Sequence, residues 1–366
     1  MAKVFVALSG GVDSSVAALL LKRAGFNVSG VFMKFWKERE NACCSLESER
    51  RARQVALKLG IPFYVFDFKK EFKEKVVDYF LKQTELGLTP NPCVVCNEKI
   101  KFGLFLKRAF KMGADFVATG HYARRRECKT QSEKRKIFSL FKAKDKKKDQ
   151  SYFLWRLDQR QLSKILFPIG DYTKPQVREI ARKAGLPTAK AKDSQNLCFL
   201  ALSPQNFLRK NLELKPGPVA EQVRYGVKKI IGRHPGLEFF TIGQRQGIGS
   251  NLFPKYQSQG PYYVLRKDLK KNQLIITRKP KDLLAKEFLA GDLHWISGQA
   301  PKMPFKAKVK IRSRQNEILG TISQSKKRGQ VLVKLAKPQK AITPGQSAVF
   351  YKGEELIGGG VIAQPR

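Results

Sequence analysis

The stretch LSGGVDSS, residues 8–15, stands between a short apolar run and a second, longer apolar stretch. Residues 3–8 are apolar and β-branched enough for a buried strand. Residues 16–24 are rich in good helix formers, and Gly25 stands where a helix C-cap would fall. We therefore predict that a strand turns into a helix here. Unpaired backbone N–H groups and the helix dipole favour an anion at such a helix N-terminus.

The residue types in this turn suit a phosphate group. Gly10 and Gly11 allow the backbone to approach a bulky anion closely. Ser14 and Ser15 add hydroxyl donors, and Asp13 is a candidate magnesium ligand. A plain strand-to-helix turn with a serine cap is the alternative. The loop lacks the lysine of a Walker A sequence and the GxGxxG spacing of a dinucleotide fingerprint. It resembles the pyrophosphate loop of the ATP-pyrophosphatase superfamily, whose members cleave ATP between its α and β phosphates and adenylate a substrate.

Length and composition limit the class of protein. The chain has 366 residues, enough for two or three domains, and 42% of them are hydrophobic. No apolar run approaches the roughly 20 residues of a membrane span, and the N-terminus enters a strand without a signal peptide. We expect a cytoplasmic protein that does not bind a membrane.

The charge balance predicts a polyanionic partner. Lys and Arg total 72 against 30 acidic residues, which gives a net charge of +42. Residues 124–148 hold 12 basic and 3 acidic residues, and residues 301–366 hold 14 basic and 3 acidic residues. A generally basic proteome, or a high-salt or high-temperature habitat, is the alternative explanation, but the local clustering favours nucleic acid.

The first 200 residues alternate strand and helix signals. Strands are expected at 3–8, 28–32, 61–68 and 115–119, and helices at 16–24, 47–59, 70–86, 97–112 and 174–184. This rhythm is typical of an open parallel sheet covered by helices, and it predicts an α/β fold. Because ligands in such sheets bind beyond the carboxyl ends of the strands, Asp13, Met33 and Gly120 are expected to share one cleft.

The rest of the chain has a different character. Residues 124–148 are expected to form a solvated excursion or a hairpin. After about residue 203, glycine, proline and β-branched residues dominate, which predicts two small β domains, the last a barrel. The expected domains are a catalytic domain at 1–203, a central β domain at 204–278 and a C-terminal tRNA-binding β-barrel at 279–366.

Six cysteines lie in a chain without a secretion signal, so they are expected to be thiols, metal ligands or redox groups. Cys93 and Cys96 form a C-x-x-C pair just before an expected helix, where thiol pKa values fall, so Cys96 is a candidate nucleophile. Inert packing or a structural metal site is the alternative for this pair. Apolar neighbours make Cys198 resemble a buried core cysteine. No role is assigned to Cys43, Cys44 or Cys128.

The motifs taken together resemble the bacterial tRNA-specific 2-thiouridylase family over residues 3–360. They are SGGVDSS, FMKFW, TPNPCVVCNEKIKFG, ATGHYAR, KKDQSYFLW, FPIGDYTKPQVREIA, KDSQNLCFL, FTIGQRQGIG and GQSAVFY, in this order. The resemblance implies ATP-dependent sulfur transfer to the wobble uridine of tRNA. ATP adenylates O2 of the base, a persulfide sulfur attacks C2, and AMP leaves.

The resemblance also assigns residues, with Cys198 as the persulfide carrier and Cys96 as the nucleophile that releases sulfur and can end in a disulfide with Cys198. Implied contacts with ATP, bound with Mg²⁺, are Ala7, Leu8, Ser9, Gly10, Gly11, Val12, Asp13, Ser14, Met33 and Gly120. Implied positions near tRNA are Asn91, Cys93, His121, Asp149, Gln150, Ser151, Ile311, Arg312 and Gln346. A sulfur-donor or sulfur-relay protein is the further partner that this chemistry implies.

One position departs from the family pattern, because Cys93 stands where the family usually has aspartate. The change removes a carboxylate that is a candidate for acid–base work. It also creates a possible three-cysteine site of Cys93, Cys96 and Cys198 for a 4Fe–4S cluster, with a neutral substitution or a resolving thiol as the alternative. Two other functions compete with thiolation: another ATP-pyrophosphatase synthetase, and a non-catalytic RNA-binding protein with a degenerate nucleotide fold.

Overall fold

The computed structural model describes residues 1–38, 46–129, 136–191, 197–200, 203–223, 228–248, 252 and 261–363. Its first sheet has five parallel strands, and LSGGVDSS follows the central one. In spatial order these strands are β3 (Phe63–Asp67), β2 (Asn27–Lys34), β1 (Lys3–Ala7), β4 (Phe116–Ala118) and β7 (Ile165–Leu166). The expected open parallel sheet is therefore confirmed, with β7 as a strand that the sequence reading did not identify.

The side chains of β1 alternate between two hydrophobic cores, one on each face of this sheet. Val4 and Val6 pack into one core with helices α1 (Val12–Arg23), α2 (Leu46–Leu59) and α8 (Lys174–Lys183). Phe5 and Ala7 pack into the other. The helical segments of that second face are α3 (Lys69–Phe72), η1 (Lys73–Val77), α4 (Asp78–Glu85), α5 (Pro92–Val95), η2 (Cys96–Leu104) and α6 (Phe105–Lys111). Period-two alternation thus gives a strand that is buried on both sides.

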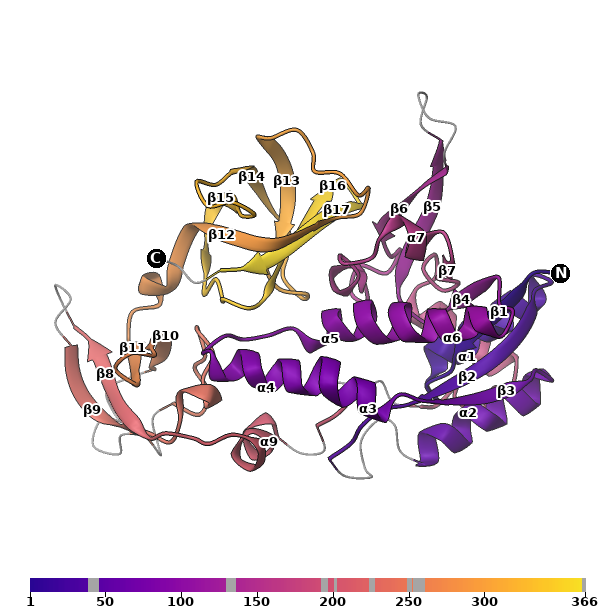
Figure 1. Cartoon of the computed structure of the whole chain (residues 1–366), viewed down its shortest axis with the longest axis horizontal. Coiled ribbons are helices and arrows are strands. Elements are labelled where there is room, and N and C mark those ends of the chain that lie inside the picture. Colours follow the sequence, from indigo (N-terminus) through magenta and orange to yellow (C-terminus); the bar gives the residue numbers. More distant parts are fainter. Residues whose placement is uncertain are drawn as a thin grey trace.

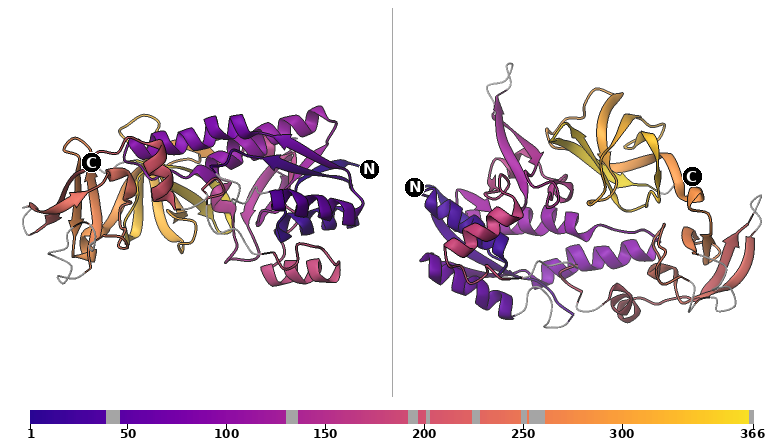
Figure 2. Two further views of the ribbon diagram at one scale, coloured as in Figure 1. Left: turned by 90° about the horizontal axis from the view of Figure 1, so that it is seen from below. Right: turned by 180° about the vertical axis from the view of Figure 1, so that it is seen from behind.

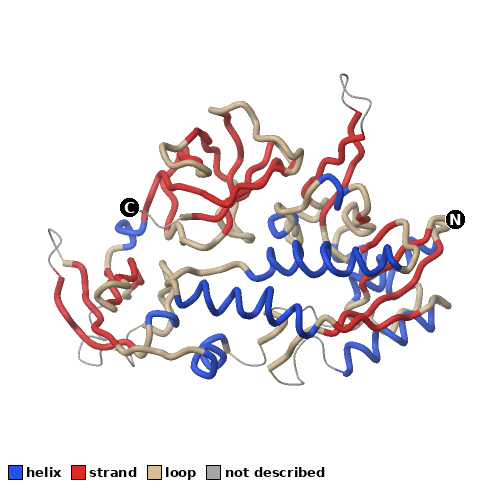
Figure 3. The backbone as a smooth tube through the Cα atoms, in the orientation of Figure 1, coloured by secondary structure: helices blue, strands red, loops and turns tan. Residues whose placement is uncertain are grey.

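A four-stranded sheet follows in the chain, in the order β10 (Tyr263–Asp268), β11 (Gln273–Thr277), β8 (Gly217–Gln222) and β9 (Lys228–His234). Its core contains Val219, Val264 and Ile276. Helix α9 (Pro204–Asn211) precedes it. Figures 1 and 3 show this sheet at the end of the molecule opposite the parallel sheet, joined to it by loops and α9.

The C-terminal strands close into an antiparallel barrel, as expected. The six strands are β12 (Leu284–Trp295), β15 (Val331–Lys340), β14 (Ile318–Gln324), β13 (Phe305–Lys310), β16 (Ser347–Lys352) and β17 (Glu355–Ile362), and β12 pairs with β17 to complete the ring. Closure removes free strand edges. Both views in Figure 2 place the barrel beside the long helices of the second face of the parallel sheet.

The basic segment after β4 is a hairpin of β5 (Ala123–Lys129) and β6 (Lys136–Lys142), which confirms that part of the expectation. Its base is not the solvated excursion we expected. Leu140 is fully buried, and β6 pairs with β17 of the barrel through Leu140–Leu356 and Phe141–Glu355. The hairpin therefore continues the barrel sheet into the N-terminal domain and fixes the two relative to each other.

The largest boundary error concerns the helix after the C-x-x-C pair. The sequence predicted a start at Asn97, but the helix begins at Pro92, a residue type favoured at the first helical position. Cys93 and Cys96 therefore lie within the helix rather than before it. From Cys96 the turns widen into a π-helix, a rare form that occurs frequently at functional sites.

Among the residues that the structure describes, every helix is too short or too polar to span a membrane.

Candidate active site

The LSGGVDSS loop joins β1 to α1 and is held by its own side chains. Gly10 has a φ of +74°, and Gly11 is the N-cap of α1. The Ser14 hydroxyl accepts from the Ser9 backbone N–H at 3.2 Å and donates to the Gly11 carbonyl. The Ser15 hydroxyl also donates to the Gly11 carbonyl, at 2.8 Å, and its side chain is buried. Ser15 therefore stabilises the loop instead of facing an anion, which corrects one expectation.

Two glycines allow backbone segments to pack closely at this loop. A Cβ on Gly120 would lie 2.6 Å from the Ser14 backbone nitrogen, and a Cβ on Gly10 would lie 2.3 Å from the Ser48 carbonyl oxygen. Both distances are shorter than any real Cβ contact, so larger residues would displace the loop. Gly120, just after β4, thus allows the backbone that follows β4 to pack directly against the loop.

Asp13 in the first turn of α1 is the charged centre of the loop. Its carboxylate accepts from the Lys174 ammonium at 2.8 Å through both oxygens, and from the Tyr122 hydroxyl at 2.8 Å. Lys174 starts α8 and its side chain is buried, so the pair sits in a partly desolvated position. Sequence reasoning singled out Asp13 but missed Lys174 and Tyr122, because their contacts depend on how α8 and the segment after β4 pack.

These groups open into a cavity of about 2030 Å³ between the parallel sheet and the barrel. Small-molecule sites usually occupy roughly 300–1,000 Å³, so the space exceeds the need of a single nucleotide. The residues predicted to contact the nucleotide all line this cavity: Ala7, Leu8, Ser9, Gly10, Gly11, Val12, Asp13, Ser14, Met33 and Gly120. The other predicted site residues that line it are Asn91, Cys93, Cys96, His121, Asp149, Gln150, Cys198 and Gln346. One cavity therefore gathers nearly the whole predicted site.

The thiols of the C-x-x-C pair differ in exposure. Cys93 is exposed to the cavity, whereas Cys96 is buried. Desolvation by the surrounding protein raises the pKa of the Cys93 thiol, and the nearby Lys101 ammonium opposes this effect. Cys93 lies in the first turn of α5, where the helix dipole lowers thiol pKa values, but desolvation outweighs that effect for this thiol. The lowered pKa was expected for Cys96, and for that thiol it stays a prediction.

His121 is buried at the cavity floor as a neutral imidazole. Its Nδ1 lies 2.8 Å from the Thr119 hydroxyl, and its ring packs between Phe102 and Phe167. Desolvation lowers its pKa well below the usual value, and the Lys101 charge lowers the pKa further. The ring therefore carries no charge at neutral pH.

The structure does not assemble the possible cluster site. Cys198 lines the same cavity as Cys93 and Cys96, but the described residues contain no group of three histidine, cysteine or acidic side chains placed to hold a metal. The described cysteines also form no disulfide bond. Cys128 lies on the hairpin in β5, and Cys43 and Cys44 lie outside the described residues.

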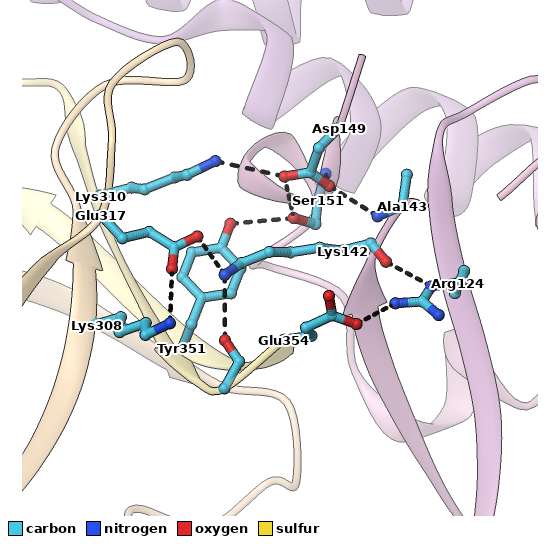
Figure 4. A network of polar contacts seen from close by, with 11 residues as sticks. Arg124, Lys142, Ala143, Asp149, Ser151, Lys308, Lys310, Glu317, Tyr351 and Glu354 are labelled. Atoms are coloured by element: carbon cyan, nitrogen blue, oxygen red, sulfur yellow. Dashed lines mark hydrogen bonds and ion pairs between the residues drawn. The ribbon is translucent and has the colours of Figure 1, made fainter. Parts of the chain in front are cut away.

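The barrel reaches the cavity through a polar network (Figure 4). Asp149 accepts from the Ala143 and Ser151 backbone N–H groups, and its other oxygen lies 3.5 Å from the Lys310 ammonium on β13. Lys142 pairs with Glu317 and lies over the Tyr351 ring. Asp149 therefore connects the N-terminal domain to the barrel, and its position near tRNA stays a prediction.

Other residues predicted near tRNA are found in three environments. Ser151 and Ile311 are fully buried, so any effect on tRNA is indirect. The Arg312 guanidinium donates to the Ala341 carbonyl at 2.6 Å on an exposed part of the barrel. Gln346 donates to the Thr89 carbonyl at 2.8 Å, which ties the barrel to the segment before Cys93. The barrel thus positions one wall of the cavity.

Family models match the chain in three consecutive segments. They are described as a tRNA methyl transferase HUP domain over residues 2–202, a tRNA methyl transferase PRC-barrel domain over 205–278 and an aminomethyltransferase beta-barrel domain over 285–362. The first alone covers more than half of the 366 residues.

Curated relatives match along nearly the whole chain. A protein named tRNA-specific 2-thiouridylase MnmA from Limosilactobacillus reuteri is 42% identical over 368 residues, covering 98% of this chain and 95% of the relative. The protein of the same name from Chloroflexus aurantiacus is 44% identical, covering 100% and 99%. Among solved structures, the U34-tRNA thiolase NcsA from Methanococcus maripaludis, described with its 4Fe–4S cluster, aligns at a TM-score of 0.35 and 18% identity over 54% of this chain and 62% of that chain, too distant to carry functional weight.

Proposed function

The chain belongs to the tRNA-specific 2-thiouridylase MnmA family, and on this basis we propose that it transfers sulfur to C2 of the wobble uridine of tRNA in two steps, of which the first consumes ATP. It is an enzyme of tRNA modification, a tRNA sulfurtransferase. The reaction takes place in the cytoplasm, with a sulfur-donor or sulfur-relay protein as partner.

The first step is adenylation at the LSGGVDSS loop. The uracil O2 attacks the α-phosphorus of ATP, and pyrophosphate leaves toward the N-terminus of α1. The observation that carries this step is the Asp13–Lys174 pair at 2.8 Å beside open loop backbone. Lys174, which pairs with Asp13, is the cation proposed to neutralise the phosphates. Asp13 is the residue that would hold Mg²⁺, whose chemistry is to polarise the phosphoryl group.

The second step moves sulfur. A persulfide on Cys198 attacks C2 of the adenylated base through its outer sulfur, and AMP leaves. The Cys96 thiolate then attacks the Cys198 sulfur, so a Cys96–Cys198 disulfide forms and the outer sulfur stays on the base. An external reductant must restore both thiols. Both cysteines line the one cavity, which supports the pairing, and closure of such a site protects the activated base from water.

The experiment that tests the first step is incubation of the protein with ATP and tRNA while pyrophosphate is measured. We expect pyrophosphate only when tRNA is present. Release with a small amine or amino acid in place of tRNA would favour another ATP-pyrophosphatase synthetase. No release under any condition would favour a non-catalytic RNA-binding protein.

The substitution Cys93→Asp separates the persulfide mechanism from a cluster mechanism. In the persulfide mechanism position 93 carries no sulfur, and aspartate is the residue that the family usually has there, so the variant is expected to thiolate tRNA at a rate near that of the wild type. In a cluster mechanism a carboxylate is a poor iron ligand. The measurement is 2-thiouridine formed anaerobically, with the iron content of the same samples. Joint loss of iron and thiolation would contradict the proposal.

Binding of tRNA is expected to depend steeply on salt. If the basic surface neutralises roughly 6–10 phosphates, affinity should fall about 10³–10⁵-fold between 50 and 200 mM salt. Lys146, Lys147 and Lys148 lie at the cavity mouth, and reversing their charge to glutamate should flatten this slope. The slope is read from binding titrations at several salt concentrations.

A matched control is available on the barrel. Residues 326–328 are likewise three consecutive basic residues, all of them exposed, but they do not line the cavity. Reversing them should change the slope less than reversing residues 146–148. Equal flattening by the two variants would mean that the basic charge acts generally and that the cavity mouth is not the binding face.

A further inference from the structure

Lys101 differs from the other cationic residues deep in the cavity. Lys174 pairs with Asp13, Lys310 with Asp149, and Lys142 and Lys308 with Glu317. Lys101 also lines the cavity, yet among the residues that the structure describes no carboxylate lies within ion-pair distance of its ammonium. A half-buried cation without a counter-charge is costly, and sites of this kind are often arranged for an anionic ligand.

The position of Lys101 is fixed by the widened helix that carries the C-x-x-C pair. Cys93, Asn97 and Lys101 follow one another at four-residue spacing, and all three line the cavity. The side chain of Asn97 is anchored by its donation to the Phe153 carbonyl at 3.0 Å. Cys93, Lys101 and His121 all line this cavity, and the Lys101 charge lowers the pKa of both the Cys93 thiol and the His121 imidazole.

We propose that Lys101 contacts the target uracil and stabilises the negative charge that develops on its N3–C4–O4 side in both steps. The inference rests on the proposed function and on the positions near tRNA that the family resemblance implies for Cys93 and His121. His121 is neutral, so among these floor residues Lys101 supplies the charge. Cys96 and Cys198, the other titratable groups of this part of the cavity, contribute sulfur rather than positive charge.

The electron movements explain why a cation is needed on that side of the ring. When O2 attacks the α-phosphorus, the N3–H proton leaves to cavity water and C2 becomes doubly bonded to N3. When sulfur adds to C2, the C2=N3 electron pair moves onto N3 and is shared with O4. Its return expels AMP, and N3 regains a proton after Cys96 releases the sulfur. A preorganised cation at O4 lowers the barrier each time this charge appears.

The test compares two uracils of different N3 acidity. With a tRNA that carries uridine at the wobble position, Lys101→Met should slow 2-thiouridine formation about 10²–10³-fold, the usual cost of removing one such stabilising group. With 5-fluorouridine at that position, the electron-withdrawing substituent stabilises the same charge, so the loss should shrink to about tenfold or less. Lys101→Arg should restore part of the rate.

The matched control is Lys99→Met, two residues away on the same helix. Lys99 is exposed, pairs with Glu98 at 2.6 Å and does not line the cavity, so its loss should leave both rates unchanged. Equal losses for the two bases in Lys101→Met, or a normal rate, would overturn the inference. Failure of the wild-type protein to form 2-thiouridine would instead overturn the proposed function.

Discussion

Replacing Asp13 with alanine is expected to reduce tRNA-dependent pyrophosphate release by at least about 100-fold while leaving tRNA affinity unchanged. The Asp13 carboxylate holds the Lys174 ammonium and the Tyr122 hydroxyl at 2.8 Å each. Without it, a buried lysine loses its counter-charge beside the loop, and the candidate magnesium ligand is gone. Pyrophosphate release and tRNA binding are measured on the same preparation.

The control for this variant is Asp67→Ala. Asp67 also ends a strand of the parallel sheet, but it is exposed and does not line the cavity. The Asp67→Ala variant should release pyrophosphate at the wild-type rate. Asp13→Asn keeps an acceptor for Tyr122 but also removes the counter-charge of Lys174, so it should lose activity as Asp13→Ala does. Normal pyrophosphate release by Asp13→Ala would mean that the loop is not the phosphate site.

Replacing Cys198 with serine is expected to separate the two steps. Adenylation does not use sulfur, so the variant should still release about one pyrophosphate per enzyme with tRNA. Formation of 2-thiouridine should fall to background, because a serine hydroxyl cannot carry a persulfide. Both products are measured in the same reaction, after the enzyme has been supplied with the sulfur donor.

Cys128→Ser is the matched control for Cys198→Ser. Cys128 is partly buried like Cys198, but it lies on the hairpin and outside the cavity lining. The Cys128→Ser variant should thiolate tRNA at the wild-type rate. If Cys198→Ser retained thiolation, the persulfide would have to reside on another cysteine. If it also lost pyrophosphate release, Cys198 would be acting in the first step or in folding.

The sequence predicted the parallel sheet well because its signals are local. β1, its loop and α1 are specified by neighbouring residues, and the glycines that permit tight turns are visible in the sequence. The ends of helices are predicted less well where helix propensity is weak. The helix that carries Cys93 starts five residues earlier than expected. That difference places Cys93 and Cys96 within the helical segment instead of before it.

Long-range contacts explain what sequence reasoning missed at the site. Lys174 meets Asp13 across 161 positions, and Gln346 meets Thr89 across 257. The hairpin looked solvated because it is rich in charge, yet its base is covered by β17 of the barrel. Lys101 gave no local signal beyond its place in the KIKF run, and only the folded structure shows that it lines the same cavity as Cys93 and His121.

The central claim is that one cavity couples ATP cleavage to sulfur transfer onto tRNA. The most direct measurement is a single turnover of persulfide-loaded protein with ATP and tRNA, in which pyrophosphate, AMP and 2-thiouridine are quantified together. The account predicts equal amounts of all three products, with none of them formed when tRNA is omitted. It would be contradicted by 2-thiouridine that forms without ATP, or by pyrophosphate and AMP that accumulate with the loaded protein while the tRNA remains unthiolated.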